Sequence, residues 1–191
     1  MKFILVESID YKMKDNKEDG KIEYRPMRDK DSFNKFAKEA KLFFKYPNGS
    51  PVDPVSDFGD AWDGYMSEIY KDGNLIGYVS MSDVFGEEGE GLGKALDIGN
   101  LIILDRGKGL GTEVIKDIVN NGRDKYDTIY CYVDADNNNA VRFYKRLGTV
   151  YDEEGPNDNN EYFVTLYPKS KTDYFSGRMK TFSKNHTFRK N

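Results

Sequence analysis

The sequence predicts one mixed α/β domain, because segments with the two-residue period of a strand alternate with segments that have the period of an amphipathic helix. A chain of 191 residues is close to the usual size of one domain. Apolar residues make up 38% of the chain, and 14 tyrosines and 12 phenylalanines supply large side chains for a core. Since no internal repeat or linker divides the chain, we expect a single core.

The composition excludes several classes of protein. The aromatic content argues against a disordered chain. The longest aliphatic runs, residues 3–6 and 101–104, are far shorter than the ~20 apolar residues of a membrane-spanning helix, and the first residues lack the pattern of a secretory signal. We therefore expect a cytoplasmic location. One cysteine, Cys131, and one histidine, His186, offer neither a disulfide framework nor a zinc site or a Ser/His/Asp triad.

The first part of the chain predicts two short strands, a helix and a long loop. Residues 3–7 and 21–25 have the pattern of strands, joined by a polar connection. In residues 31–46, apolar side chains recur at steps of three and four, which indicates a helix that packs on a core. Residues 47–64 are rich in Pro, Gly and Asp and predict a loop. Because long loops are often functional, this one is a candidate substrate lid.

The middle of the chain predicts a hairpin and then a buried strand. Asp72-Gly73-Asn74 is a strong turn signal, and the apolar patterns on either side of it predict two antiparallel strands. A loop rich in Gly and Glu follows at residues 86–93. Residues 96–104 are mostly apolar and predict a buried strand.

A glycine-rich turn follows this buried strand directly, at residues 106–111, and leads into a helix. The helix is predicted by apolar residues that share one face, namely Leu110, Val114, Ile115, Ile118 and Val119. Unpaired N–H groups and the dipole at a helix start bind phosphate. Gly109 and Gly111 would let a pyrophosphate approach the backbone, while Arg106 and Lys108 could neutralise its charge. The spacing matches neither a dinucleotide fingerprint nor a P-loop, so neither NAD nor a nucleoside triphosphate is the expected ligand.

Two motifs in order make the chain similar to a known family. Arg106, Gly109 and Gly111 match the acyl-CoA signature R/Q-x-x-G-x-G/A of the GCN5-related N-acetyltransferases (GNAT). The family's second block, N-x-x-A-x-x-F/Y-Y-x-x-x-G-F, is matched by Asn137, Ala140, Phe143, Tyr144 and Gly148, with Thr149 in place of the last aromatic. The order of elements resembles the family over residues 1–167, which leaves residues 168–191 as a basic C-terminal tail. The resemblance implies a central, mostly antiparallel sheet that is splayed around acetyl-CoA, with helices on both faces and no metal.

The resemblance also implies which residues bind acetyl-CoA. The exposed backbone of the strand before the turn would pair with the pantetheine arm; its residues are Gly99, Asn100, Leu101, Ile102 and Ile103. The pyrophosphate would lie on the turn formed by Arg106, Gly107, Lys108, Gly109, Leu110, Gly111 and Thr112. Asn137 matches an asparagine that helps to hold the cofactor arm, although an N-cap of the following helix explains Asn137 equally well. The strand could likewise be an ordinary buried strand.

By the same resemblance, Tyr144 would be the acid that protonates the departing CoA thiolate, and it would also contact the cofactor. The alternative is a tyrosine that packs one face of a helix. The reaction also needs a group that accepts the proton of the attacking amine. Asp97 is the first choice, because it begins the strand that binds the cofactor; Glu68, on the hairpin, is the second. Either carboxylate could instead be a solvated acid at the end of a strand.

Charge is unevenly distributed. Residues 168–191 hold seven Lys or Arg and one Asp, a local charge of +6, so the net charge of −4 leaves −10 on the other 167 residues. The acids concentrate in two stretches: Asp53, Asp57, Asp60, Asp63 and Glu68, and then Asp83, Glu87, Glu88, Glu90 and Asp97. We expect Asp57, Asp60, Asp63 and Asp97 to bind a cationic acceptor; solvated loop charges are the alternative.

The sequence thus predicts an acetyl-CoA-dependent N-acetyltransferase that acts on a primary amine of a cationic small molecule, aminoglycoside-like or polyamine-like. Residues 95–115 and the hairpin resemble the aminoglycoside 6'-N-acetyltransferase branch. Alternatives are a protein or peptide N-acetyltransferase, an aminoacyl-tRNA N-acetyltransferase and a non-catalytic CoA-binding module. The basic tail keeps a nucleic-acid partner open, or it is a loosely ordered terminus. Either a monomer or a homodimer agrees with the sequence.

Overall fold

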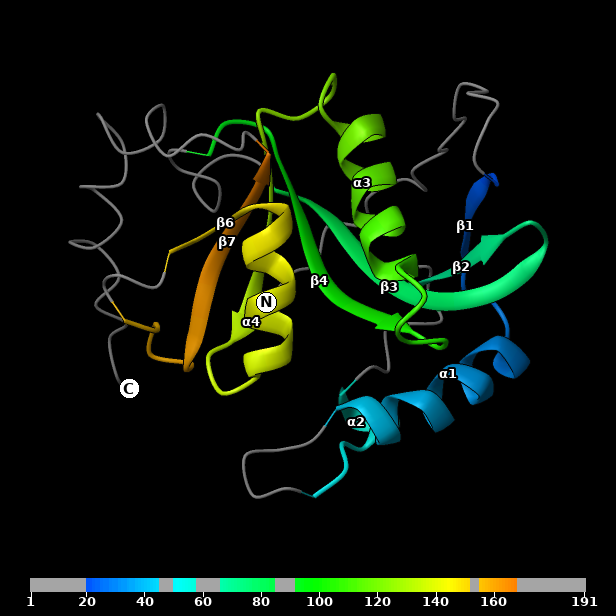
Figure 1. Ribbon diagram of the computed structural model, residues 1–191. Helices are drawn as coiled ribbons and strands as arrows, with labels where there is room; N and C mark the ends of the chain where they lie inside the picture. Colours follow the sequence, from blue (N-terminus) through cyan, green and yellow to red (C-terminus); the bar gives the residue numbers. More distant parts are fainter. Residues whose placement is uncertain (1–19, 45–49, 58–65, 85–91, 152–154, 168–191) are drawn as a thin grey trace. The chain divides into compact units, whose positions relative to one another are not determined.

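The fold was analysed in a computed structural model (Figure 1). The structure describes residues 20–44, 50–57, 66–84, 92–151 and 155–167. The strand predicted at residues 3–7 and the basic tail lie outside the described residues, as does most of the predicted loop at residues 86–93.

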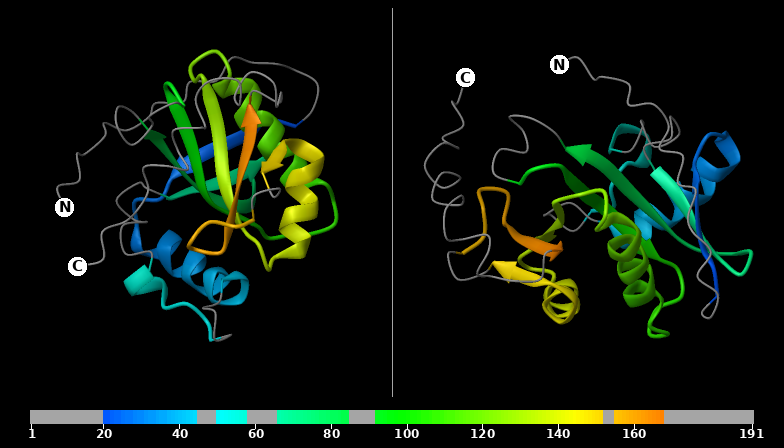
Figure 2. Two further views of the ribbon diagram at one scale, coloured as in Figure 1. Left: turned by 90° about the vertical axis from the view of Figure 1, so that its left-hand side faces the viewer. Right: turned by 90° about the horizontal axis from the view of Figure 1, so that it is seen from above.

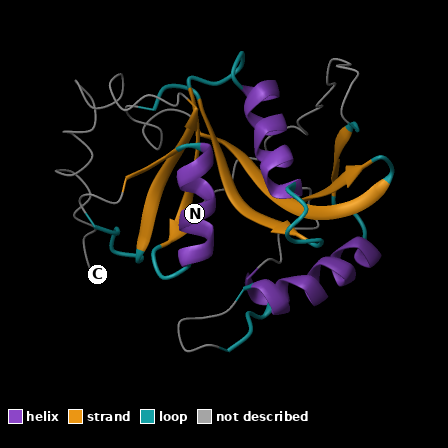
Figure 3. Ribbon diagram, viewed as in Figure 1, coloured by secondary structure: helices purple, strands orange, loops and turns teal. Residues whose placement is uncertain are grey.

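Helices and strands are mixed along the described chain, which confirms the predicted α/β class (Figure 3). The elements are β1 (Ile22–Pro26), α1 (Lys30–Phe43), α2 (Pro54–Asp57), β2 (Met66–Lys71), β3 (Asn74–Val84), β4 (Ala95–Ile103), α3 (Leu110–Gly122), β5 (Thr128–Asp134), α4 (Asn138–Leu147), β6 (Thr149–Tyr151) and β7 (Glu161–Tyr167). Hydrogen bonds join the strands in the order β1-β2-β3-β4-β5-β7-β6. The pairs β1–β2, β2–β3, β5–β7 and β6–β7 are antiparallel, and β4–β5 is parallel.

The chain forms two compact units, and the boundary between them crosses β3, β4 and α3. The first unit contains residues 1–81 and 99–117, and the second contains residues 82–98 and 118–191. The first therefore includes β1, α1, α2, β2 and the glycine-rich turn. The second includes β5, α4, β6, β7 and the start of β4.

In the first unit, α1 is the amphipathic helix predicted at residues 31–46, although it ends at Phe43. Its N-cap is Asp29, whose carboxylate accepts a hydrogen bond of 2.8 Å from the N–H of Ser32. Its apolar face enters a core formed by Met27, Phe33, Phe36, Ala40, Val52, Met66, Tyr78 and Ile102. The ring of Phe36 meets Tyr78 edge-on at 5.4 Å between centroids. The predicted period thus identified the buried face of this helix.

Within residues 50–57, the described part of the predicted loop, the sequence analysis missed the short helix α2. The carboxylate of Asp53 accepts a hydrogen bond of 3.1 Å from the N–H of Val55, and Pro54 occupies the first helical position. α2 lies beside the end of α1 (Figure 2). A four-residue helix is too short to show a 3.6-residue period, so only the Asp-Pro start could have indicated it.

α3 covers the face of the first unit's strands that lies opposite α1. The hydroxyl of Tyr24 on β1 donates to Asp117 at 3.0 Å, and Lys71 on β2 forms an ion pair with Glu113. Tyr24 pairs with Ile69, whereas Met66 points to the other face and contacts the core under α1. Helices therefore cover both faces here, as the resemblance implies.

The predicted hairpin is confirmed in β2 and β3. Asp72 and Gly73 have φ angles of 52° and 77°, and Lys71 pairs with Asn74 across the two-residue turn. Further along β3, a Cβ atom at Gly77 would lie 2.2 Å from the carbonyl oxygen of Ile102. The backbones of β3 and β4 thus approach each other closely at this glycine.

In the second unit, β5 lies between β4 and β7, and its side chains point alternately to the two faces of the sheet. Cys131 and Val133 are buried, and Cys131 is hydrogen-bonded to Tyr144 of α4. Tyr130 and Tyr132 alternate with them and therefore point to the opposite face. Thr149, which replaces the aromatic residue of the family's second block, begins β6 and pairs with Thr165. None of the described helices is long and apolar enough to cross a membrane.

Candidate active site

The glycine-rich turn after β4 has the geometry of an anion site. Gly107 and Gly109 have φ angles of 83° and 80°, and a Cβ atom at either would have no heavy atom within 4 Å. α3 begins at Leu110, and its first bonds run from the N–H groups of Thr112 and Glu113 to the carbonyl of Gly109, at 2.9 and 3.2 Å. The N–H groups at the very start of a helix precede any intrahelical acceptor, so they are available to a phosphate. The residues present therefore fit the pyrophosphate of CoA.

The predicted cations of this turn have partners within the first unit. The guanidinium of Arg106 lies over the ring of Phe43 at 4.2 Å. The ammonium of Lys108 pairs with Asp105 at 2.5 Å, and both side chains are exposed. Exposed ion pairs contribute little, so a phosphate can replace Asp105 as the partner of Lys108. Gly111 lies in the first turn of α3, so the glycines that use the left-handed region are Gly107 and Gly109.

The predicted pantetheine strand is the second half of β4, residues 99–103. Across from it on β3, the hydroxyl of Ser80 accepts hydrogen bonds from the N–H and the side-chain amide of Asn100, at 2.7 and 3.3 Å. Among the described residues, the parallel pairing of β4 with β5 comprises Ala95, Leu96 and Asp97. The register thus ends before the predicted cofactor-binding residues, as expected for a strand that leaves its backbone to a ligand.

Tyr144 lies on α4 and is only 9% exposed. Burial, together with a hydrogen bond to the thiol of Cys131, raises the pKa of its hydroxyl well above the ordinary value. Burial also raises the pKa of Cys131, to about 12, so both groups are protonated at neutral pH. The Tyr144 hydroxyl is therefore protonated and hydrogen-bonded to a neutral partner, and its role as an acid stays a prediction. Cys131 is a neighbour that the sequence analysis did not identify.

Asp97 is the candidate base with the more unusual surroundings. Its Oδ1 atom is buried and has no hydrogen-bond partner among the described residues. Burial, and secondarily the charge of Glu161, raises the pKa of the carboxyl from 3.8 to about 6. A carboxylate that titrates near neutrality and keeps an accepting oxygen free is suited to general-base catalysis.

Glu68, the second candidate, lies in the first unit and is only 7% exposed. Its carboxylate accepts a hydrogen bond of 3.2 Å from the hydroxyl of Tyr70, and the guanidinium of Arg25 lies 4.0 Å from the centre of the Tyr70 ring. Glu68 is thus already part of a polar cluster, whereas Asp97 has an unused oxygen. This difference favours Asp97.

The other predicted site residues have mixed outcomes. Asn137 is the N-cap of α4, and its side-chain oxygen accepts a hydrogen bond of 3.1 Å from the N–H of Ala140. The capping alternative is therefore confirmed, and a contact with the cofactor stays a prediction. Asp57 is the last residue of α2. Asp60 and Asp63 lie outside the described residues.

Two further residues near Asp97 were not identified from the sequence, Tyr132 on β5 and Glu161 on β7. Both interact electrostatically with Asp97. The alternation of Tyr130 and Tyr132 was a possible signal for one of them, but nothing near Glu161 in the sequence points to a site. No group of three metal-ligating side chains occurs in the described part of the chain.

Comparisons with known proteins identify the family and the fold of the chain. The model of the acetyltransferase (GNAT) family matches residues 33–149. Among solved structures, NAA60 of Arabidopsis thaliana with a bisubstrate analogue is similar in fold, with a TM-score of 0.53 and 18% identity over 76% of this chain and 98% of that one. A possible acetyltransferase of Clostridium difficile 630 has a TM-score of 0.52 and 18% identity over 68% of this chain and 90% of that one. A search of curated proteins found no significant match. The chain belongs to the acetyltransferase (GNAT) family, whose members are N-acetyltransferases that use acetyl-CoA as cosubstrate.

Proposed function

We propose that this protein transfers the acetyl group of acetyl-CoA to a primary amine of a cationic small molecule, of the aminoglycoside or polyamine type. The observation that carries the proposal is the buried oxygen of Asp97 that has no hydrogen-bond partner among the described residues. The pKa of this carboxyl is raised to about 6, and Asp97 lies in the unit that also contains Tyr144. A charge of −10 outside the tail supports a cationic acceptor, because opposite charge raises the rate of encounter.

Each proposed residue has a distinct task. The turn at residues 106–112 holds the pyrophosphate, and the backbone of residues 99–103 pairs with the pantetheine arm. Asp97 accepts a proton from the amine as its nitrogen attacks the thioester carbonyl. A C–N bond forms, the C–S bond breaks, and Tyr144 donates its proton to the departing thiolate. The hydrogen bond between the Tyr144 hydroxyl and the sulfur of Cys131 orients this hydroxyl before the transfer.

Other acceptors and a non-catalytic module are the competing functions. The acidic body disfavours a tRNA acceptor. A module that only binds CoA would have no use for an unpartnered buried carboxylate oxygen, which is unfavourable to keep. Protein and peptide N-termini remain the second class of acceptor, and the test must therefore include them.

The test is an assay of free CoA released from acetyl-CoA, with aminoglycosides, polyamines, free amino acids, peptides and charged tRNA as acceptors. We expect turnover with the amines that carry several positive charges. Turnover with peptides alone would replace the proposed acceptor class. Absence of turnover with every acceptor, despite acetyl-CoA binding, would support the non-catalytic module.

Gly109→Ala tests the glycine-rich turn. The added methyl group would occupy the space above the turn and strain a left-handed backbone. We therefore expect the Kd for CoA to rise about tenfold, which corresponds to a loss of ~1.4 kcal/mol of binding free energy. Calorimetric titration with CoA measures it. Gly155→Ala is the matched control, because Gly155 has the same φ within a degree and equally open surroundings. Both variants should lose ~1 kcal/mol of stability. Equal CoA affinities in the two variants would rule out the turn as the anion site.

A further inference from the structure

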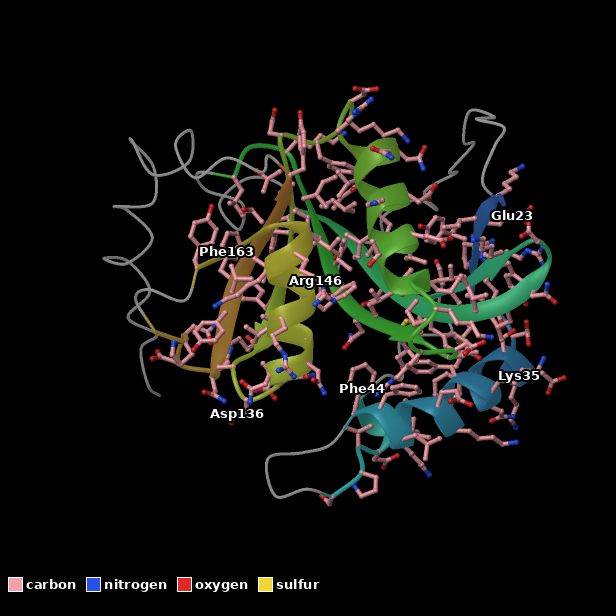
Figure 4. The ribbon with its side chains drawn as sticks, viewed as in Figure 1. Glu23, Lys35, Phe44, Asp136, Arg146 and Phe163 are labelled. Carbon is pink, nitrogen blue, oxygen red and sulfur yellow. The ribbon has the colours of Figure 1, made fainter. Side chains whose placement is uncertain are left out.

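An aromatic cluster lies on the face of the second unit's sheet opposite α4, with Tyr130 buried and Tyr132 exposed. We call it the aromatic wall and define it as Tyr130 and Tyr132 on β5, Phe163 on β7 and Tyr151 on β6. Phe163 pairs with both Tyr132 and Tyr151 across the strands. Their ring centroids are 5.4 Å (Tyr132–Phe163), 5.7 Å (Tyr151–Phe163) and 5.9 Å (Tyr130–Tyr132) apart. Figure 4 labels Phe163 on β7.

Tyr132 is the exposed member of the wall. It is 41% exposed, one of the few large aromatic side chains of the described residues with this much free surface. Its neighbours on β5, Cys131 and Val133, are buried on the other face. Exposed aromatic surface beside polar groups is typical of a binding site, because the ring offers both apolar contact and a negative face for cations.

Two carboxylates border the wall. Asp97 pairs with Tyr130, and Glu161 precedes Phe163 by two residues on β7, so both lie on the face of the wall. After burial, the charges of Asp97 and Glu161 are the causes that raise the pKa of Tyr132. Glu161 also raises the pKa of Asp97. The three side chains are thus close enough to interact.

No cation compensates these carboxylates within the described part of the chain. The side-chain contact of Glu161 is a long hydrogen bond, 3.4 Å, from the amide of Asn157. Three ion pairs of the described residues involve other acids, Glu23, Glu113 and Asp105. Two carboxylates that repel each other beside an exposed aromatic ring favour a ligand with positive charge.

We propose that the aromatic wall, with Asp97 and Glu161, is an acceptor subsite that selects small amines with a second ammonium group. The reacting amine faces Asp97, and the second ammonium lies between Glu161 and the ring of Tyr132. The apolar chain between the two nitrogens packs on Phe163. A monoamine leaves Glu161 without a counter-charge, so the subsite distinguishes diamines from monoamines. This inference rests on the proposed function.

The subsite is tested by binding, independently of turnover. Cadaverine and pentylamine have the same carbon chain and differ in the second amine. In calorimetric titrations of the full chain with CoA present, we expect cadaverine to bind about tenfold more tightly. Glu161→Gln should remove most of this tenfold preference by weakening cadaverine alone. Asp124→Asn, which removes an exposed acid of the same unit outside the subsite, should leave both affinities unchanged.

Variants of Tyr132 separate the contribution of its aromatic ring to amine binding from an effect on folding. Tyr132→Leu should weaken cadaverine several-fold, whereas Tyr132→Phe retains the ring face and should restore the affinity. Circular dichroism checks that each variant is folded. If Glu161→Gln is not folded, Glu161→Asp, which keeps the charge, is measured in its place.

The outcomes for the subsite and for the proposed function are distinct. Equal affinities for the two amines, or a preference that Glu161→Gln leaves intact, would overturn the subsite even if some amine is acetylated. Absence of turnover with every amine would instead refute the proposed function, while the binding preference for cadaverine would still establish the subsite.

Discussion

Tyr144→Phe is expected to lower kcat by ~10² to 10⁴-fold, the usual contribution of a positioned acid, while leaving the Kd for acetyl-CoA unchanged. The phenylalanine ring keeps its packing against Phe143, whose centroid is 5.0 Å away, so only the hydroxyl is lost. The thiolate must then depart without a proton from the enzyme. Steady-state kinetics with the preferred amine and calorimetry with acetyl-CoA measure the two quantities.

Tyr126→Phe is the matched control for this variant. Tyr126 is also buried in the second unit, and its hydroxyl donates to Asp83 at 2.5 Å. Loss of that hydrogen bond should reduce stability by ~1 kcal/mol and leave kcat unchanged. A Tyr144→Phe enzyme with normal turnover, or a Tyr126→Phe enzyme with the same kcat loss, would remove Tyr144 from the reaction.

Asp97→Asn is expected to change the pH dependence as well as the rate. Wild-type kcat/KM should fall as the pH drops through about 6, because protonated Asp97 cannot accept the amine proton. The amide cannot accept it at any pH, so this acidic limb should flatten and activity at neutral pH should fall by ~10² to 10⁴-fold. Activity should partly recover at high pH, where more of the acceptor is already neutral.

Glu68→Gln supplies the comparison for this profile. Glu68 is a buried carboxylate that accepts a hydrogen bond from Tyr70. We expect Glu68→Gln to keep the acidic limb near pH 6 and most of the activity. If Asp97→Asn retained the wild-type profile and Glu68→Gln lost it, the roles would be reversed.

Asp97→Asn should also make the protein more stable, which separates its catalytic role from a structural one. Folding raises the pKa of Asp97 from 3.8 to about 6, so the folded state disfavours the carboxylate. This penalty is absent below about pH 4, where the carboxyl is protonated in both states, and is fully present above about pH 6. The penalty is at most roughly 3 kcal/mol, since each tenfold change in the acid dissociation constant corresponds to about 1.4 kcal/mol. Denaturant unfolding should therefore show a stabilised variant near neutral pH and no gain near pH 4.

The sequence by itself determined most of the elements and the cofactor turn. The elements α1, β2, β3, β4 and α3 follow from period and turn residues, because burial of one face imposes that period on the chain. The turn at residues 106–111 was recognised because left-handed glycines and a helix start are local features. The second motif likewise located α4 and its N-cap, Asn137.

Only the tertiary structure decided how the candidate acid and bases differ. Asp97 and Glu68 are both carboxylates on predicted strands. The tertiary structure buries one oxygen of Asp97 without a hydrogen-bond partner among the described residues, whereas Glu68 accepts a hydrogen bond from Tyr70, two residues along the same strand. Cys131 beside Tyr144, and Glu161 with Tyr132 beside Asp97, are likewise brought together by α4, β5 and β7. The pKa of a group depends on desolvation and on neighbouring charges, and residues distant in sequence supply both, so no local pattern encodes it.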